Sequence, residues 1–163
     1  MNCLPPEDCP FFLITRASLT ITAIFKKMLA KNKLTEIKPS YLGALMCLWA
    51  NEGMDEMLSK FGSEDGMKLS ELGRCAGLEP STITGLVDRM ERDGLVFRTN
   101  VPDDRRAQKA NLTEKGSSVR TSVLSAVDAM EKEAFAGVDS EDMEVAKKVL
   151  RTLLKNASKR GVK

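Results

Sequence analysis

Two adjacent arginines stand in a polar stretch of the sequence. Arg105 and Arg106 follow Asp104 in the run 100–106, which separates two segments of strand composition, so we expect an exposed hairpin tip there. Guanidinium groups at such a tip can enter the minor groove of DNA, where the negative potential is enhanced, and a carboxylate can orient a neighbouring arginine through a bidentate pair. Isolated arginines are more often part of a solvated turn. The surrounding elements must therefore decide whether this pair meets DNA.

The sequence lacks the residue type on which many catalytic sites depend. The sequence contains no histidine, which excludes Ser-His-Asp and Cys-His arrangements and histidine acid/base catalysis. Its four cysteines, Cys3, Cys9, Cys47 and Cys75, are 6, 38 and 28 positions apart, which is not the spacing of zinc ligands. The sequence contains neither of the glycine-rich loops that bind phosphate groups, GxGxxG and GxxxxGK followed by Ser or Thr. We expect no enzyme, no metal and no cofactor, and a function in binding.

Length and composition are typical of a globular protein. The 163 residues are 42% hydrophobic and 29% charged, and the longest uncharged apolar stretch, 39–50, is too short to cross a bilayer. The amino terminus lacks the basic and then apolar pattern of a secretion signal. We therefore expect a cytoplasmic protein with no membrane contact. The net charge of +2 does not by itself predict nucleic-acid binding.

The middle of the chain predicts a helix-turn-helix followed by a wing. Residues 69–78 form a short amphipathic helix that we expect Ser70 to cap and Gly77 to end, and a second helix runs from Pro80 to Gly94. Two helices joined by a tight turn present the start of the second helix outward, into the major groove. Strands 95–99 and 107–112 would enclose the arginine-bearing tip. The second helix would offer DNA the following side chains: Ser81, Thr82, Thr84 and Gly85, with Asp88 and Arg89 further along.

Further helices surround this unit. Apolar residues recur at helical spacing over 11–29, and a helix from residue 39 or 40 to 51 would bury Tyr41, Ala44, Leu45, Leu48 and Trp49. Thr113 caps a long helix that reaches about residue 136, and Asp139 caps a last one. The acidic run 53–66 predicts a surface excursion with a short helix around 54–61.

The apolar stripes of the outer helices exceed what one winged unit can cover, so we expect a homodimer. The fold class is mainly α with a small β wing, a winged helix-turn-helix with long dimerisation helices. Residues 1–38 and 113–163 would form the dimerisation region and residues 39–112 the DNA-binding region, as one intertwined domain.

The spacing across the middle of the chain matches a known signature. It reads Ser81-Thr82-Ile83-Thr84-x-Leu86-Val87-Asp88-Arg89-Met90-Glu91-x-x-Gly94-Leu95-Val96, and then Asp104-x-Arg106-x5-Leu112-Thr113-x-x-Gly116. In this run the chain resembles the MarR (multiple antibiotic resistance regulator) family of winged helix-turn-helix transcriptional regulators. It departs from the pattern at Val101, where an aspartate often precedes the wing proline, and in the length of 53–66.

The resemblance implies a homodimeric, sequence-specific regulator that binds a pseudo-palindromic operator in double-stranded DNA, a repressor relieved by a small ligand. It also implies a cleft for an aromatic or phenolic ligand, for which Arg16, Tyr41 and Trp49 are the candidates, although a lone tryptophan is more often packing. Two alternatives stay open. One is a winged-helix module for protein contacts without an operator, which has no need of paired wing arginines, and the other is a redox-sensing regulator that uses Cys9. Cys47 and Cys75 are expected in the core.

Overall fold

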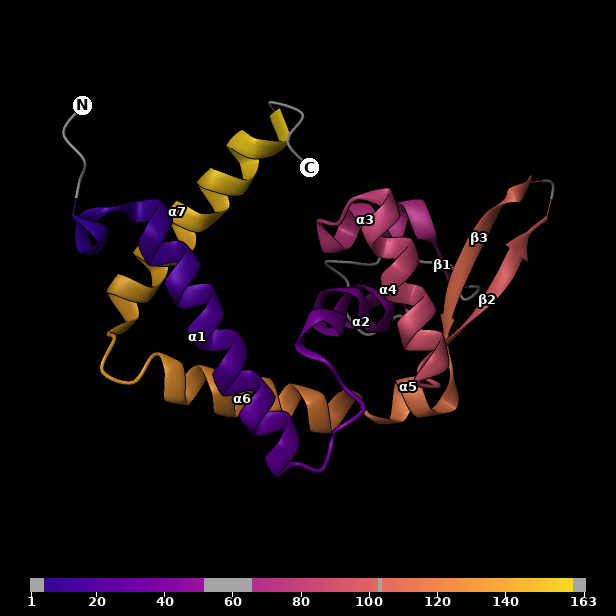
Figure 1. Ribbon diagram of the computed structural model, residues 1–163, viewed down its shortest axis with the longest axis horizontal. Coiled ribbons are helices and arrows are strands. Elements are labelled where there is room, and N and C mark those ends of the chain that lie inside the picture. The colour runs from indigo at the N-terminus through magenta and orange to yellow at the C-terminus, as the bar shows by residue number, and fades with distance from the viewer. Residues whose placement is uncertain (1–4, 52–65, 103, 160–163) are drawn as a thin grey trace. The chain divides into compact units, whose positions relative to one another are not determined.

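The computed structural model describes residues 5–51, 66–102 and 104–159, and Figure 1 shows the order of its helices and strands. These residues form two compact units, Met1–Pro39 with Thr121–Ala136 and Ser40–Arg120 with Gly137–Lys163. No helix among the described residues has the length and apolar character needed to cross a membrane. The expected excursion at 53–66 lies outside the described residues, apart from Gly66.

The first unit pairs α1 (Pro10–Lys31) with α6 (Arg120–Ala134), and a single 3-10 turn, η1 (Pro6–Asp8), precedes α1. Pro10 occupies the first position of α1, as expected, where its missing N–H costs no hydrogen bond. The two helices cross in Figure 1, and the Lys27 Nζ donates to Glu133 Oε1 at 2.9 Å. Only the last third of α1 is buried. The buried side chains of the two helices are Phe25, Met28, Leu29, Val123, Ala126 and Met130.

In the second unit, three helices pack around one apolar core. The chain enters through a 3-10 turn, η2 (Pro39–Tyr41), and continues as α2 (Leu42–Trp49), α3 (Leu69–Ala76) and α4 (Pro80–Arg92). The side chains expected on the buried side of α2 are buried, which confirms that interpretation; they are Tyr41, Ala44, Leu45, Leu48 and Trp49. The stripe expected on α4 is likewise confirmed, with Ile83, Leu86, Val87 and Met90 buried.

The sequence predicts the C-terminal cap of α3 correctly but not its N-terminal cap. Gly77 ends the helix in the left-handed conformation, at φ 66°, and the Leu78 N–H donates to the Gly73 carbonyl at 2.8 Å. At the other end the cap is Lys68 and not Ser70, which lies inside the first turn. The reason is a short strand that the sequence does not predict. This strand, β1 (Met67–Lys68), pairs with β3, and α3 starts directly after it.

The wing is the antiparallel pair β2 (Val96–Val101) and β3 (Asp104–Leu112), and the sheet order is β1-β3-β2. These strands extend further than expected, because ladder hydrogen bonds use the main chain and tolerate polar side chains. The expected loop 100–106 is therefore too long, and the arginines at 105 and 106 lie within β3. The register shifts between Asn100 and Val101, near the end of the wing.

A tight joint connects the wing to the following helix. Thr113 caps α5 (Glu114–Ser118) as expected, and its Oγ1 accepts the Gly116 N–H at 2.9 Å. A Cβ atom on Gly116 would lie 2.0 Å from the Leu95 carbonyl oxygen, so only glycine fits. The Trp49 indole donates to the Gly116 carbonyl at 3.0 Å, which fixes α5 to α2.

The long helix expected over 114–136 is interrupted at Val119, and it continues as α6. Ser118 donates its hydroxyl to the Lys115 carbonyl at 3.0 Å, a local bond that competes with helix continuation. Residues 113–120 lie in the second compact unit. The last helix, α7 (Ser140–Lys159), begins as expected, because the Asp142 N–H donates to Asp139 Oδ1 at 2.8 Å.

Candidate nucleic-acid interface

The first half of α4 presents a polar surface. Ser81, Thr82 and Thr84 are exposed, on the side opposite the buried stripe. Thr84 donates its hydroxyl to the Pro80 carbonyl at 2.9 Å, which leaves the oxygen of that hydroxyl as an acceptor. A Cβ atom on Gly85 would meet only the Arg89 Nη1 atom, at 3.7 Å. A partner can therefore come close to the backbone of α4 at Gly85.

Arg98, on β2, fastens the wing to α4. Its Nη2 atom donates to Asp88 Oδ1 at 2.5 Å and to the Thr84 carbonyl at 3.2 Å, and its Nη1 atom donates to Glu91 Oε2 at 3.3 Å. The Arg98 main-chain N–H also donates to Glu91 Oε1 at 3.1 Å. We call these four residues the Arg98 network. It holds successive turns of α4 to one strand of the wing.

Arg98 is not among the residues that the sequence predicts for the site, although the sequence holds a signal for it. Asp88 and Glu91 are spaced i, i+3 on one helix, which places two carboxylates side by side and calls for a cation beside them. We expected Asp88 to face DNA, but the structure gives its carboxylate the guanidinium of Arg98 as a partner. Arg89, which we also expected at the DNA, is half-buried on the same helix. Asp88 therefore helps to hold the wing to α4, and its expected contact with DNA stays a prediction.

A hollow has lining residues from both the wing and α4. Thr84 of α4, Lys68 of β1 and Asp104 and Gln108 of β3 are among its lining residues. Asp104 is exposed there. The side chains of Arg105 and Arg106 lie outside the described residues, so the expected pair between Asp104 and a wing arginine stays a prediction. Two of the expected DNA-contacting residues, from different elements, nevertheless line the same hollow.

Two of the three residues expected to line a ligand cleft are buried. Tyr41 is fully buried and donates its hydroxyl to Asp93 Oδ2 at 2.6 Å. Trp49 is 2% exposed and its indole N–H is used by Gly116. Arg16 is exposed on α1, in the other unit. Tyr41 and Trp49 therefore act as packing residues here, which is the simpler of the two interpretations of an aromatic side chain at helical spacing.

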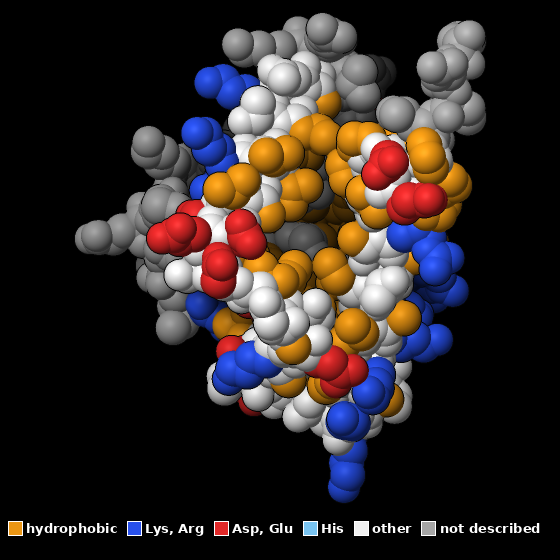
Figure 2. All heavy atoms as spheres, turned by 90° about the vertical axis from the view of Figure 1, so that its left-hand side faces the viewer, with side chains coloured by type: hydrophobic (Ala, Val, Ile, Leu, Met, Phe, Trp, Pro, Cys, Tyr) orange, Lys and Arg blue, Asp and Glu red, His pale blue; other side chains and the backbone are white. Residues whose placement is uncertain are grey.

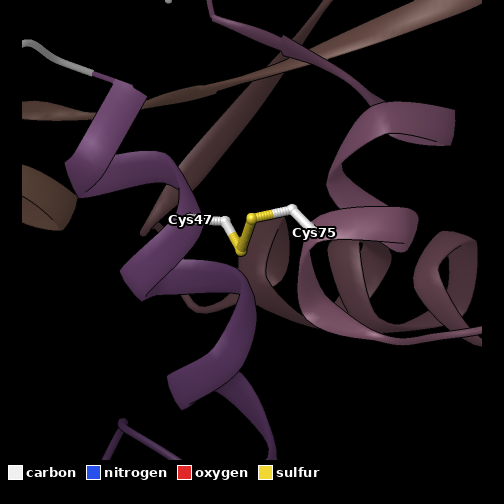
Figure 3. The surroundings of a disulfide bond; sticks show 2 residues. All are labelled: Cys47 and Cys75. Atoms are coloured by element: carbon white, nitrogen blue, oxygen red, sulfur yellow. A yellow bond between two sulfur atoms is a disulfide. The ribbon is translucent and has the colours of Figure 1, made fainter. Parts of the chain in front are cut away.

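The cysteines differ from their expected roles. Cys47 and Cys75 form a disulfide between α2 and α3, and Cys75 is exposed, so the expectation that both lie in the core is wrong for Cys75 (Figure 3). Cys9 is a half-buried free thiol at the start of α1. No group of three potential metal ligands comes together in the described part of the chain.

Comparisons with known proteins give the same fold. The sequence profile of the MarR family matches residues 40–108. Among solved structures, the PcaV transcriptional regulator from Streptomyces coelicolor, in complex with its natural ligand, is 23% identical with a TM-score of 0.77, over 96% of this chain and 99% of that one. Sco3205, a MarR-family transcriptional regulator from the same organism in complex with DNA, is 20% identical with a TM-score of 0.74, over 96% and 91%.

A third relative is CouR from Rhodococcus jostii RHA1 bound to p-coumaroyl-CoA, which is 22% identical with a TM-score of 0.71, over 93% of this chain and 95% of that one. The helix-turn-helix and the first part of the wing thus lie in the segment that the profile matches, while the end of β3 and the signature residues 112–116 lie beyond it. The outer helices follow the same fold as the solved structures. Residues 40–108 thus match the MarR family of transcriptional regulators, and the chain as a whole shares the fold of these solved regulators.

Proposed function

We propose that this protein is a homodimeric transcriptional repressor that binds a pseudo-palindromic DNA site and leaves it when a small ligand binds. The observation that carries the proposal is the surface of α4, whose hydroxyl groups and Gly85 are presented outward while the Arg98 network fixes the helix to the wing. A helix held this rigidly can enter a major groove without ordering first. Relatives of the same fold have been solved with DNA.

Within that proposal, the surface of α4 reads bases and the wing adds affinity. Hydroxyl groups such as those of Thr82 and Thr84 can bond to base edges, whereas arginines at the end of the wing meet phosphates or the minor groove. Two copies related by two-fold symmetry would place their α4 helices about one helical turn of DNA apart, roughly 10 base pairs. The bound duplex should therefore have dyad symmetry.

The test is selection of bound duplexes from a random library, followed by affinity measurements at several salt concentrations. Thr84→Ala should reduce the difference in affinity between selected and random duplexes. Thr22→Ala is its control. Both threonines are exposed on helices and donate to the carbonyl four residues back, at 2.9 Å for Thr84 and 2.7 Å for Thr22. Equal effects of the two changes would mean that helix stability, and not base contact, explains the loss.

Variants of the wing distinguish the contribution of phosphate contacts from the recognition of base sequence. Arg105→Ala or Arg106→Ala should weaken binding to every duplex and lower the slope of log K against log salt by roughly one phosphate contact per subunit. Asp104→Ala should have a milder effect of the same kind, since we propose that it orients an arginine. Unchanged affinity and slope in both arginine variants would favour the protein-contact module over a DNA-binding wing.

The proposed dimer rests on apolar side chains that one protomer leaves uncovered. On α1 the exposed hydrophobic residues are Phe11, Phe12, Leu13, Ile14 and Leu19, and on α7 they are Val145, Val149, Leu150, Leu153 and Leu154. Figure 2 shows many hydrophobic side chains, in orange, at the surface that it presents, and each of the two helices carries its own exposed set. Uncovered patches of this kind mark association sites, and a second copy of the chain covers them most simply.

Sedimentation tests the dimer. The protein should run at about twice the 17.9 kDa of one chain, and Leu153→Asp should give monomers, because dimerisation would bury an unpaired charge. Met46→Asp is a matched control, since Met46 is 49% exposed and Leu153 46%, but Met46 lies on α2. A monomer in the unmodified protein, or dissociation by Met46→Asp, would contradict the assignment of this interface.

Release by a ligand is the remaining part of the proposal. One relative of this fold is bound to p-coumaroyl-CoA, and another is described as regulated in DNA binding by 6-hydroxynicotinic acid. We infer an aromatic acid or its thioester as the ligand class here. Arg16, exposed on α1, is the cationic candidate for its carboxylate. A panel of aromatic acids should include one that releases DNA from the protein but acts less strongly on Arg16→Ala; a panel without effect would refute this part.

A further inference from the structure

The disulfide between α2 and α3 joins a shielded cysteine to an accessible one. Cys47 lies in the second half of α2 and is 7% exposed, whereas Cys75 lies in the last turn of α3 and is exposed. Their Cα atoms are 6.2 Å apart, and their side chains meet across the gap between the two helices (Figure 3). A small thiol or disulfide can therefore approach the pair from the Cys75 side.

The two helices do not depend on this bond for their packing. Leu45 and Leu48 of α2 and Leu72 of α3 are all buried at 2% exposure or less, in the core that the helices share. The turn after α3 is closed independently by the Leu78 N–H and the Gly73 carbonyl. The bond can therefore open while the helices keep their apolar contacts, which is the condition for reversible thiol chemistry in a folded protein.

We propose that Cys47 and Cys75 are a reversible thiol–disulfide pair that exchanges with small disulfides, and that the oxidised form binds DNA more tightly. In the first step the Cys75 thiolate attacks a small disulfide RSSR, which forms a mixed disulfide on Cys75 and releases one RS⁻. The Cys47 thiolate then attacks the Cys75 sulfur and releases the second RS⁻. The two cysteines lose two protons and two electrons, and RSSR becomes two thiols. Two small thiols reverse the sequence.

The effect on DNA follows from what each helix carries. Gly73 of α3 packs closely on α4, because a Cβ atom there would lie 3.2 Å from Ile83 Cγ2, so α3 and α4 move together. Trp49 ties α2 to α5, and Tyr41, just before α2, is tied to Asp93 after α4. The disulfide thus fixes the α3–α4 pair to the rest of the winged unit, and a pair that is already ordered loses less entropy when it binds.

This inference rests on the proposed DNA binding, and the experiment separates the two. A Cys3→Ser/Cys9→Ser chain is equilibrated with mixtures of glutathione and glutathione disulfide, and its free thiols are counted by mass after alkylation. We expect two thiols to disappear together. The melting temperature of the oxidised form should be higher by roughly 5–10 °C, since the bond closes a 28-residue separation. Thiols that stay free in excess glutathione disulfide would overturn the proposal.

DNA affinity is then measured for both forms on duplexes selected with the oxidised protein. The reduced form should bind at least about fivefold more weakly. Cys47→Ala/Cys75→Ser should bind like the reduced form under both conditions; should this variant not fold, the reduced protein supplies the same comparison. Equal affinity of the two forms overturns the regulatory role but leaves DNA binding intact. Failure of both forms to bind any duplex overturns the proposed function and the regulatory role together, although the thiol count still reports the pair.

Discussion

Replacing Arg98 with methionine removes the guanidinium that joins the wing to α4 and keeps the aliphatic part of the side chain. Two ion pairs are lost, to Asp88 and Glu91, whose side chains are 51% and 40% exposed. Because solvent screens them, each contributes about 0.5 kcal/mol. The bond from the guanidinium to the Thr84 carbonyl adds about 1 kcal/mol. The expected loss in the free energy of unfolding is therefore about 2 kcal/mol.

A matched control uses an ion pair of similar length that lies within one helix and joins no two elements of the fold. Lys132 Nζ lies 2.7 Å from Asp128 Oδ2, four residues earlier on α6, and both side chains are well exposed. Lys132→Met should cost at most about 0.5 kcal/mol. Urea unfolding measures both variants, and Arg98→Met should also lower the melting temperature by roughly 4–8 °C. Equal losses in the two variants would refute the view that Arg98 holds the wing.

The DNA readout distinguishes positioning from contact. With Arg98 gone, the carboxylates of Asp88 and Glu91 face each other without a cation and add negative charge beside the proposed phosphate surface. Affinity should fall roughly tenfold, while the slope of log K against log salt stays close to that of the unmodified protein. Arg98→Lys should recover only part of the affinity, because the lysine ammonium lacks the planar set of donors with which a guanidinium reaches several acceptors at once. A slope lowered by a full contact would show that Arg98 meets a phosphate.

Three further changes test the joints of the winged unit. Gly116→Ala should cost about 3 kcal/mol or abolish folding, because its Cβ would sit 2.0 Å from the Leu95 carbonyl oxygen; circular dichroism and urea unfolding measure this, and a mild loss would contradict it. Gly85→Ala should raise stability by about 0.5–1 kcal/mol yet weaken DNA binding if DNA approaches the backbone there. Tyr41→Phe should cost about 1–2 kcal/mol, since Asp93 loses a 2.6 Å bond from a buried hydroxyl.

The elements of the winged unit could be predicted because their signals are local. Pro80 at the first position of α4, Gly77 at the end of α3 and Thr113 before α5 each act through the backbone of their own turn. The two-residue strand β1 could not be predicted, because only its pairing with β3, more than 40 residues later, defines it. Short strands of this kind depend on tertiary contacts and leave no periodicity to detect.

The sequence indicates which residue types the candidate site uses, but it does not indicate which partner each side chain contacts. Charge alone does not distinguish a carboxylate that faces DNA from one that faces an arginine, and Asp88 proved to face Arg98. The pairing of Cys47 with Cys75 depends on how α2 and α3 pack, which their 28-residue separation does not specify. In the same way, Tyr41 and Trp49 could line a cleft or fill a core by sequence, and burial places them in the core.

Residues of the MarR signature thus fall into two groups, according to whether the protomer itself needs them. Gly116 leaves no room for a side chain and Thr113 caps α5, so the fold alone accounts for both. Ser81 and Thr82 are exposed, and α4 is capped at Glu79 without a bond from any side chain. Nothing in the folding of α4 calls for two hydroxyls there, so replacing them should leave stability within about 0.5 kcal/mol. Their types are then best explained by what binds α4, and a loss of discrimination between DNA sequences without a loss of stability is the result that this explanation requires.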